Sequence, residues 1–303
     1  MAITVSYNRY ITVYKRYKNA YKNYISVMFN MIMNKDTINV VTREGKTDKW
    51  KRTYVWTYPL LCNLIKDQNY SNNINYFSDK TNYFEFKFNN KDLKFYGIKE
   101  GNGDFVGIFI NNEYEFLNPN ECAVIDIGAN IGDSAIYMIM NNAKKVVSLE
   151  PYPYSYNLAL KNIELNNLKD RITLINGGYG KDSIIKIDEN KITDAGTDLV
   201  FSNEGKEIQL YSLKKIIKDF NLDGDLLLKM DCEGCEYNLL NEDSETLKKF
   251  KRIQIEYHYG YEKLVDKLKE CNFKIEYTKQ RKSYNPSASD PNMIVGFIYA
   301  EKL

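Results

Sequence analysis

The residues with the clearest chemical signature form a glycine-containing loop over 124–133, which reads VIDIGANIGD. Gly128 allows a tight turn, and Gly132 allows a ligand or a helix to approach the backbone closely. The loop leads into a predicted helix, whose N-terminal amides can bind a carboxylate. Asp126 ends an apolar strand, where open α/β sheets bind their ligands, and its carboxylate can hold an ammonium group. The loop therefore suits an amino-acid-shaped ligand that carries both groups.

A second carboxylate lies where a nucleoside would need one. Glu150 directly follows the next predicted strand after the glycine loop. A carboxylate in that position can bind the two hydroxyls of a ribose. The two loop glycines are four residues apart and no third glycine follows at the required place, so the loop is not the dinucleotide fingerprint. A nucleotide-binding α/β domain of another type is the alternative.

Candidates for proton transfer follow two later apolar strands. Asp231 follows the predicted strand 226–230, and His258 follows the predicted strand 252–257. Both strand ends should open onto the crevice that also holds Asp126. His258 is the natural general base because its unperturbed pKa lies near neutral pH, and a structural histidine bonded to backbone is the equal alternative. Asp231 is the stronger functional candidate, because a carboxylate at the end of a buried strand is costly without a partner.

Three other acidic residues could assist them. Glu233 and Glu236 could bind acceptor hydroxyls, or they could merely begin the next helix, where acidic residues are favoured. Glu256 lies one alternation before His258 on the same strand face and could support it.

Metal and redox chemistry have weaker support. His258 is the single histidine, which excludes a multi-histidine zinc site, and we expect no metal. Cys232 and Cys235 form a C-x-x-C pair, for which a redox site is conceivable. Zinc would need two more ligands, and no second pair exists. Small apolar packing is the preferred interpretation of both cysteines.

The elements that position these groups alternate along the second part of the chain. Apolar strands alternate with helices from residue 121 onward, which predicts an α/β domain over 121–303 with a mostly parallel sheet covered on both faces. The last two strands, 273–278 and 293–300, predict an antiparallel edge. The other predicted strands are 123–127, 145–149, 172–175, 207–211, 226–230 and 252–257, and the predicted helices are 133–141, 154–166, 213–220 and 261–271.

Residues 1–120 are predicted to form an accessory region. A short helix is expected over 58–66, with turns at Gly45 and Pro59. A period of two follows, which predicts a small antiparallel sheet with hairpin turns at 89–92 and 111–112. Its strands are expected near 83–88, 93–98, 105–110 and 113–117.

Residues 1–35 carry a heptad-spaced stripe that predicts one helix with basic residues on its other faces. Three interpretations stay open: the stripe packs on the rest of the protein, it mediates self-association, or it binds an anionic membrane surface. The stripe consists of Tyr7, Tyr10, Tyr14, Tyr17, Tyr21, Tyr24, Met28 and Met31.

Composition adds only broad limits. The net charge of +2 is too small to suggest nucleic acid on electrostatic grounds alone. No run of eighteen apolar residues and no signal-peptide pattern occur, and the five scattered cysteines fit a reducing setting. We therefore expect a cytoplasmic protein, with peripheral membrane contact through residues 1–35 as the open alternative.

Four blocks of the sequence resemble the FkbM family of methyltransferases. They read VIDIGANIGDSAIY, VVSLEPYPYSYNLALKNIELNN, LLLKMDCEGCEYNLL and IQIEYHYG, and they occur in the family's order across roughly residues 121–260. The resemblance implies the seven-stranded, Rossmann-like class I fold, S-adenosylmethionine as cofactor, and O-methylation of a hydroxyl on a sugar or secondary metabolite. Cys232 and Cys235 depart from the small residues that usually stand in the third block.

The resemblance also implies roles for individual residues. Glu150 is expected to contact the ribose, and Asp231, His258 and Glu233 form the predicted catalytic set. Asn176 and Gly177, at the end of the third strand, are expected near the adenine. The residues expected at the methionine part of the cofactor are Asp126, Gly128, Asn130, Gly132 and Asp133.

The sequence therefore predicts an O-methyltransferase that acts on a glycan, glycolipid or other polyhydroxylated metabolite. A nucleic-acid methyltransferase is one alternative, but neither an Asn/Asp-Pro-Pro-Tyr motif nor a Pro-Cys nucleophile occurs. Its one support is the basic, tyrosine-rich N-terminus, since tyrosines can stack on bases. A non-catalytic, cofactor-binding scaffold is the other alternative, and the set of Asp126, Glu150 and Asp231 argues against it.

Overall fold

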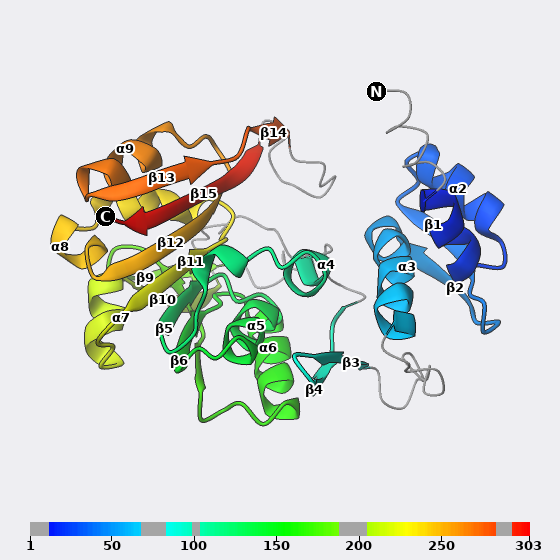
Figure 1. The fold of residues 1–303 in the computed structure, drawn as a ribbon, viewed down its shortest axis with the longest axis horizontal. Helices are drawn as coiled ribbons and strands as arrows, with labels where there is room; N and C mark the ends of the chain where they lie inside the picture. The colour runs from blue at the N-terminus through cyan, green and yellow to red at the C-terminus, as the bar shows by residue number, and fades with distance from the viewer. Residues whose placement is uncertain (1–11, 68–82, 99–103, 188–204, 283–292) are drawn as a thin grey trace.

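The computed structural model describes residues 12–67, 83–98, 104–187, 205–282 and 293–303, and its largest element is an eight-stranded sheet (Figure 1). The strand order is β13-β15-β12-β11-β5-β6-β7, and β14 pairs with β15. The strands from β12 to β7 are parallel, whereas β15 is antiparallel to both of its neighbours. The bounds are β5 (Ala123–Ile127), β6 (Lys145–Leu149), β7 (Ile172–Ile175), β11 (Leu226–Met230), β12 (Phe250–Tyr257), β13 (Phe273–Tyr277), β14 (Arg281–Lys282) and β15 (Ile294–Lys302).

Alternate residues of the parallel strands face two different layers of helices. Val124 and Val146 belong to an apolar cluster with α5, whereas Ile125 and Val147 belong to a second cluster with α7 and α9. A sheet covered on both faces needs continuous apolar strands, and the sequence supplies them. The predicted α/β class and the antiparallel edge are confirmed. The covering helices are α5 (Asp133–Met140), α6 (Pro153–Leu165), α7 (Leu213–Asp219) and α9 (Glu262–Glu270).

One strand that was predicted within the main series lies outside it. β10 (Lys206–Tyr211) pairs with β8 (Gly177–Tyr179) and β9 (Ser183–Ile187) in a separate three-stranded sheet. These two partners come from the stretch 178–205 that was expected to be irregular, of which 188–204 lie outside the described residues. The small sheet places Gly177 and Tyr179 beside the strand ends of the main sheet, at the cavity described below.

The first part of the chain forms helices and two hairpins. The predicted helix 58–66 lies inside the longer α3, and Pro59 is within this helix instead of at a turn. The elements are α2 (Tyr24–Ile32), β1 (Thr37–Val41), β2 (Thr47–Lys51), α3 (Arg52–Asp67), β3 (Phe84–Phe88), β4 (Lys91–Phe95), α4 (Asp104–Phe109) and the 3₁₀ turn η1 (Glu115–Leu117).

The predicted strands over 105–110 and 113–117 are wrong, because these residues form α4 and η1. Four of the six residues of α4 are buried apolar side chains, so no periodicity distinguished helix from strand. The helical spacing brings Phe105 and Phe109 together, with ring centroids 4.8 Å apart, and both rings pack against Phe86 and Phe95. The expected small antiparallel sheet is therefore only the β3–β4 hairpin in this region.

The predicted N-terminal helix is interrupted. Residues 12–20 are helical, the helix breaks at Tyr21, and α2 begins at Tyr24. Tyr21 forms an isolated bridge with Thr42, and its hydroxyl donates to the Val55 carbonyl over 2.9 Å. Tyr17 and Tyr21 are buried, which confirms the packing interpretation for these two, while Tyr14 is exposed. The stripe positions at 7 and 10 lie outside the described residues.

The division of the chain after residue 120 stays a prediction. One apolar cluster contains side chains from both sides of that point, among them Tyr21, Phe105 and Val124. The accessory region thus contributes to the core on one face of the main sheet. In the part of the chain that the structure describes, no helix combines the length and apolarity that a membrane span requires.

We expect Phe109→Ala to reduce the free energy of unfolding by about 3–5 kcal/mol, because its buried ring joins the β3–β4 hairpin to α5. Phe29→Ala is the matched control and should change it by less than about 0.5 kcal/mol, because Phe29 is 61% exposed. Urea unfolding followed by circular dichroism measures both. Equal effects of the two substitutions would contradict the packing described for α4.

Candidate functional site

A cavity of about 670 Å³ opens at the carboxyl ends of β5, β6 and β11, between the main sheet and the small sheet. The strand order reverses between β5 and β11, which is where open α/β sheets bind ligands. The volume lies in the range of small-molecule sites. The predicted residues that line it are Gly128, Asn130, Glu150, Gly177, Asp231 and Glu233, together with Cys232 and Cys235.

Glu150 is a buried carboxylate that is held in one orientation. Its Oε2 accepts a hydrogen bond from the Asn130 amide over 2.8 Å, and its Oε1 accepts one from the Tyr152 amide over 3.0 Å. Burial raises the pKa of Glu150 to about 7, against the opposing effect of the two amides. Each oxygen keeps a lone pair beyond its amide bond, so the carboxylate can still accept hydrogen bonds from a ligand in the cavity.

Gly128 brings the cofactor loop into contact with the reactive end of β11. It has a φ of +83°, and a Cβ atom built there would lie 1.8 Å from the Asp231 carbonyl oxygen. Asp231 in turn donates its amide to the Ile127 carbonyl over 3.0 Å. Only glycine meets both the conformation and the close approach at this position. The two strand ends are therefore held in direct contact at the floor of the cavity.

Asp126 does not line this cavity. It is fully buried, and its Oδ2 accepts hydrogen bonds from Ser134 and Ser148, each over 2.9 Å. Its Oδ1 lies 3.1 Å from Nζ of Lys229, which is itself 2% exposed. The side chain points into the sheet layer, so the structure does not bring it to the place expected for a ligand's ammonium group.

Lys229 connects this ion pair to the loop. Its Nζ donates to the Gly128 carbonyl over 2.6 Å and lies 3.3 Å from the Ile127 carbonyl. Burial lowers the pKa of Lys229, but the charges of Asp126 and Asp231 and the hydrogen bond to Asp126 outweigh burial, so the pKa is raised. Lys229 is thus a cation at neutral pH that holds the loop onto β11.

The other residues predicted at the cofactor have mixed positions. Gly132 faces α6, and a Cβ atom there would lie 3.2 Å from Cα of Ala159, so it serves helix packing. Asn176 donates to the Glu150 and Pro151 carbonyls and supports the cavity wall from behind. Asp133 is buried, and among the described residues its Oδ2 has no hydrogen-bond partner.

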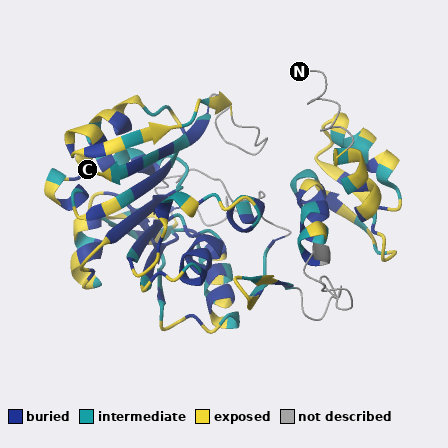
Figure 2. Cartoon of the chain, in the orientation of Figure 1, coloured by how far each residue is buried: buried dark blue, intermediate teal, exposed yellow. Residues whose placement is uncertain are grey.

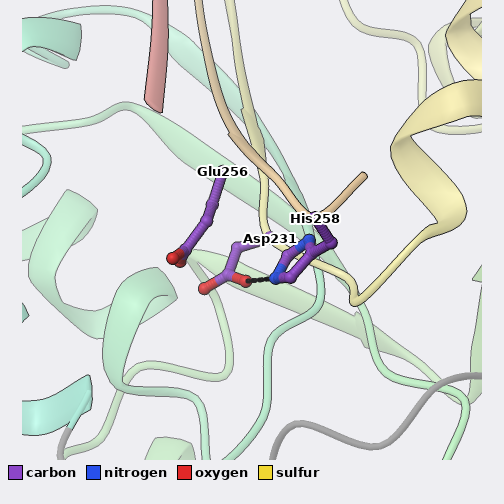
Figure 3. Close-up of side chains that lie close together, drawn as sticks. All are labelled: Asp231, Glu256 and His258. Atoms are coloured by element: carbon purple, nitrogen blue, oxygen red, sulfur yellow. Dashed lines mark ion pairs between the residues drawn. The ribbon is translucent and has the colours of Figure 1, made fainter. Parts of the chain in front are cut away.

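His258 lies between carboxylates at the other side of Asp231 (Figure 3). Its Nδ1 lies 3.0 Å from Oε1 of Glu236, which also accepts the His258 amide over 2.9 Å. Its Nε2 lies 3.3 Å from Oε2 of Glu233 and 4.0 Å from Oδ1 of Asp231. The structure therefore brings the three predicted catalytic residues together.

The protonation of His258 differs from the sequence-based expectation. Burial lowers its pKa, but the hydrogen bond and charge of Glu236 and the charges of Glu233 and Glu256 outweigh burial and raise the pKa to about 10. The imidazole is therefore cationic at neutral pH and has no free lone pair to act as a general base. The near-neutral value assumed from the residue type is wrong, because four acidic residues around it could not be located from the sequence.

More carboxylates gather at this corner than the sequence indicated. Burial, followed by the charge of Asp231, raises the pKa of Glu113 to about 7 and the pKa values of Asp104 and Glu256 well above their ordinary range. Ligand atoms of Asp231, Glu256 and His258 lie within 4.8 Å of one another, close enough to share a cation (Figure 3). The expectation of no metal rested on multi-histidine sites and stays a prediction.

Cys232 and Cys235 are joined by a disulfide, with Cα atoms 5.5 Å apart. The interpretation of the two cysteines as small apolar packing residues is thus wrong. The disulfide closes the turn that carries Glu233, whose φ is +53°, and Gly234, whose φ is +115°. It therefore holds in place the turn that presents Glu233 to His258.

Sequence reasoning missed several residues of the site. Lys229 had a signal, because it is a charged residue inside the buried apolar strand LLLKM. Asp104 and Glu113 had none, because they flank segments that were predicted as strands. Tyr179 lines the cavity from the small sheet, which lay in a stretch predicted to be irregular.

Comparisons with known proteins agree with the site. Residues 126–275 match the family model described as the methyltransferase FkbM domain. No curated protein matches the sequence.

Three solved structures illustrate the similarity in fold. M. capricolum TrmK in complex with S-adenosyl-homocysteine is 19% identical, with 64% of this chain and 68% of that chain covered and a TM-score of 0.40. Precorrin-6y C5,15-methyltransferase from Geobacter metallireducens is 15% identical, with 63% and 86% covered and a TM-score of 0.36. Ribosomal protein L11 methylase from Lactobacillus delbrueckii is 15% identical, with 67% and 81% covered and a TM-score of 0.38.

We expect Lys229→Met to reduce the free energy of unfolding by about 3–5 kcal/mol, because it leaves the Asp126 charge buried without its partner. The double variant Asp126→Asn/Lys229→Met should lose clearly less than the sum of its two single variants, since it removes both charges. Chemical unfolding of the four proteins gives the coupling free energy. Strict additivity would show that the buried pair does not hold β5 and β11 together.

Proposed function

Residues 126–275 of this chain belong to the FkbM methyltransferase family, and from that premise we propose that this S-adenosylmethionine-dependent methyltransferase methylates a hydroxyl group of a glycan, glycolipid or other polyhydroxylated metabolite. The observation that carries the proposal is the group of carboxylates around Asp231 at one end of the cavity. Carboxylates accept hydrogen bonds from the several hydroxyls that such an acceptor presents.

The cavity fits the cofactor on three observations. Glu150 is a fixed carboxylate with free lone pairs, suited to the ribose hydroxyls. Gly128 leaves a bare backbone at the floor of the cavity, where the methionine part would lie. Asp133 has an unsatisfied buried oxygen at the N-terminus of α5. Gly177 and Tyr179 line the remaining wall, where the adenine would pack. When bound, S-adenosylmethionine supplies an electrophilic methyl group on a sulfonium.

The charge of the reactive corner distinguishes acceptor classes. The carboxyl groups of Asp104, Glu113, Asp231, Glu233 and Glu256 act on one another strongly enough to raise the pKa values of several of them. A phosphate backbone entering this corner would meet like charge, whereas nucleic-acid sites are basic. A neutral acceptor with many hydroxyls meets only hydrogen-bond acceptors. This favours a glycan or related metabolite over RNA.

In the proposed mechanism Asp231 is the residue that takes the proton. It lines the cavity and is in contact with the cofactor loop, so an acceptor hydroxyl bonded to its carboxylate would lie next to the methyl donor. As the new oxygen–carbon bond forms and the carbon–sulfur bond breaks, the hydroxyl proton passes to the Asp231 carboxylate. His258, held cationic by Glu236, offsets the negative charge of Asp231 and Glu233.

We expect Asp231→Asn to reduce kcat by about 10²–10⁴-fold with little change in cofactor affinity, because the variant keeps the shape of the side chain and loses the base. The measurement is transfer of a labelled methyl group to separated glycan, lipid and RNA fractions, with calorimetry for cofactor binding. Asp223→Asn, an exposed acidic residue away from the cavity, is the control and should transfer at the wild-type rate.

Three outcomes of this assay separate the functions. Label in glycan or lipid that Asp231→Asn abolishes supports the proposal. Label in RNA with the same dependence would replace it with nucleic-acid methylation. Cofactor binding without transfer to any fraction would indicate a non-catalytic scaffold.

We expect cofactor affinity to fall as the pH is lowered through about 7, because protonation of Glu150 replaces one hydrogen-bond acceptor by a donor. At pH 8 the Glu150→Gln variant should bind about tenfold to hundredfold more weakly than wild type, and the difference should shrink at pH 6. Titration calorimetry across this range measures both proteins. The ribose role of Glu150 fails if the variant binds as tightly as wild type at pH 8.

A further inference from the structure

Helix α2 has a second apolar face that nothing in the described structure covers. Its inner side packs into the core through Val27, which is fully buried. The outer side carries four exposed apolar side chains, which we call the outer α2 face: Ile25 is 70% exposed, Phe29 61%, Ile32 76% and Met33 57%. Ile25, Phe29 and Ile32 follow the spacing i, i+4, i+7, so they share one side of the helix. A contiguous apolar surface of this kind marks an interaction site.

The outer α2 face lies away from the catalytic part of the molecule. α2 packs on β1, while α3 contacts β1 and β2 on one side and α4 on the other. α2 is thus at the far end from the main sheet (Figure 1), and exposed residues cover its outer side (Figure 2). A large flat partner can reach this face without obstructing the cavity at β5 and β11.

The surroundings of this face are basic. The segment 1–67 contains twelve Lys and Arg against four Asp and Glu, whereas the segment 68–303 contains thirty against thirty-six. The first segment therefore carries a formal charge of +8 and the second −6. Lys22 precedes the face by three residues and Lys35 follows it by two, and both are exposed.

Further basic residues lie at the start of α2. The bridge between Tyr21 and Thr42 places Lys22 beside the following turn, where its Nζ lies 3.4 Å from the position of a Cβ atom on Gly45. Arg43 and Lys46 belong to that turn. Cationic side chains thus stand at both ends of the exposed apolar stripe.

We propose that the outer α2 face docks the protein on a lipid bilayer that contains anionic lipids, with the apolar side chains among the acyl chains and the flanking lysines at the headgroups. Lysines at such a boundary keep their charge in water while their stems cover apolar surface. Two copies packed through this face would bring two like-charged segments together, which argues against a second copy as the occupant. Nucleic acid would match the charge but leave Ile25 and Ile32 without apolar contacts. The inference does not depend on which acceptor is methylated.

The test is sedimentation of the full-length protein with vesicles of phosphatidylcholine alone or with about 30 mol % phosphatidylserine. The variant Phe29→Ser/Ile32→Ser removes half of the outer α2 face at exposed positions. Tyr154→Ser/Ile184→Ser removes an aromatic and an isoleucine that are also exposed, from α6 and β9, and is the matched control. Circular dichroism and cofactor calorimetry of each variant establish that the fold and the catalytic domain are intact.

The wild-type protein should bind the anionic vesicles at least about tenfold more tightly than the neutral ones, and added salt should weaken that binding. Phe29→Ser/Ile32→Ser should lose at least about tenfold in affinity for the anionic vesicles, while the control variant should bind as wild type does. Lys22→Gln/Lys35→Gln should lose severalfold through charge alone.

Several results would overturn the proposal. Wild-type protein that stays in the supernatant with anionic vesicles rejects it, as does unchanged binding of Phe29→Ser/Ile32→Ser. Light scattering that finds a dimer dissolved by the same two substitutions would identify a second copy as the occupant. RNA binding that these substitutions abolish would identify nucleic acid instead.

Discussion

The buried ion pair between Lys229 and Asp126 is the interaction on which the site depends. The two residues are register partners on neighbouring parallel strands, β11 and β5. Removing both charges from water is costly, and the hydrogen bonds that Asp126 accepts from Ser134 and Ser148 offset part of that cost. In return Lys229 has donors left for the carbonyls of the cofactor loop. One cation thus determines where the loop ends and how closely Asp231 approaches it.

From that point the charges of the molecule separate into opposite regions. The reactive corner concentrates carboxylates around Asp231, and His258 becomes cationic there because Glu236 bonds to its Nδ1. The segment 1–67 carries the compensating positive charge, and its helix α2 lies at the far end from the main sheet. An acidic corner suits a neutral acceptor rich in hydroxyls, and a basic end suits an anionic surface. These two features are physically independent, since different elements carry them.

What the sequence could predict depended on how local the determining contact is. The parallel strands were predictable because strands buried on both faces need uninterrupted apolar runs. The positions of Gly128 and Glu150 at the cavity were predictable because each directly follows its strand. The environment of His258 was not, since Glu236 lies on a different element and the orientation of both side chains depends on the fold. Asp126 was assigned to a ligand because no pattern places Lys229 beside it before the strand order is known.

The N-terminal helices show the limit of periodicity most clearly. The tyrosine stripe correctly indicated a buried face at Tyr17 and Tyr21, but the helix breaks at Tyr21 because a bridge to Thr42 satisfies the backbone differently. The exposed residues Phe29 and Ile32 lie off that stripe, on the side that the pattern assigned to solvent. A helix that is apolar all round is stable in water only if both sides are covered. The fold covers one side of α2, so the stability and the function of the other side must come from a partner outside the chain.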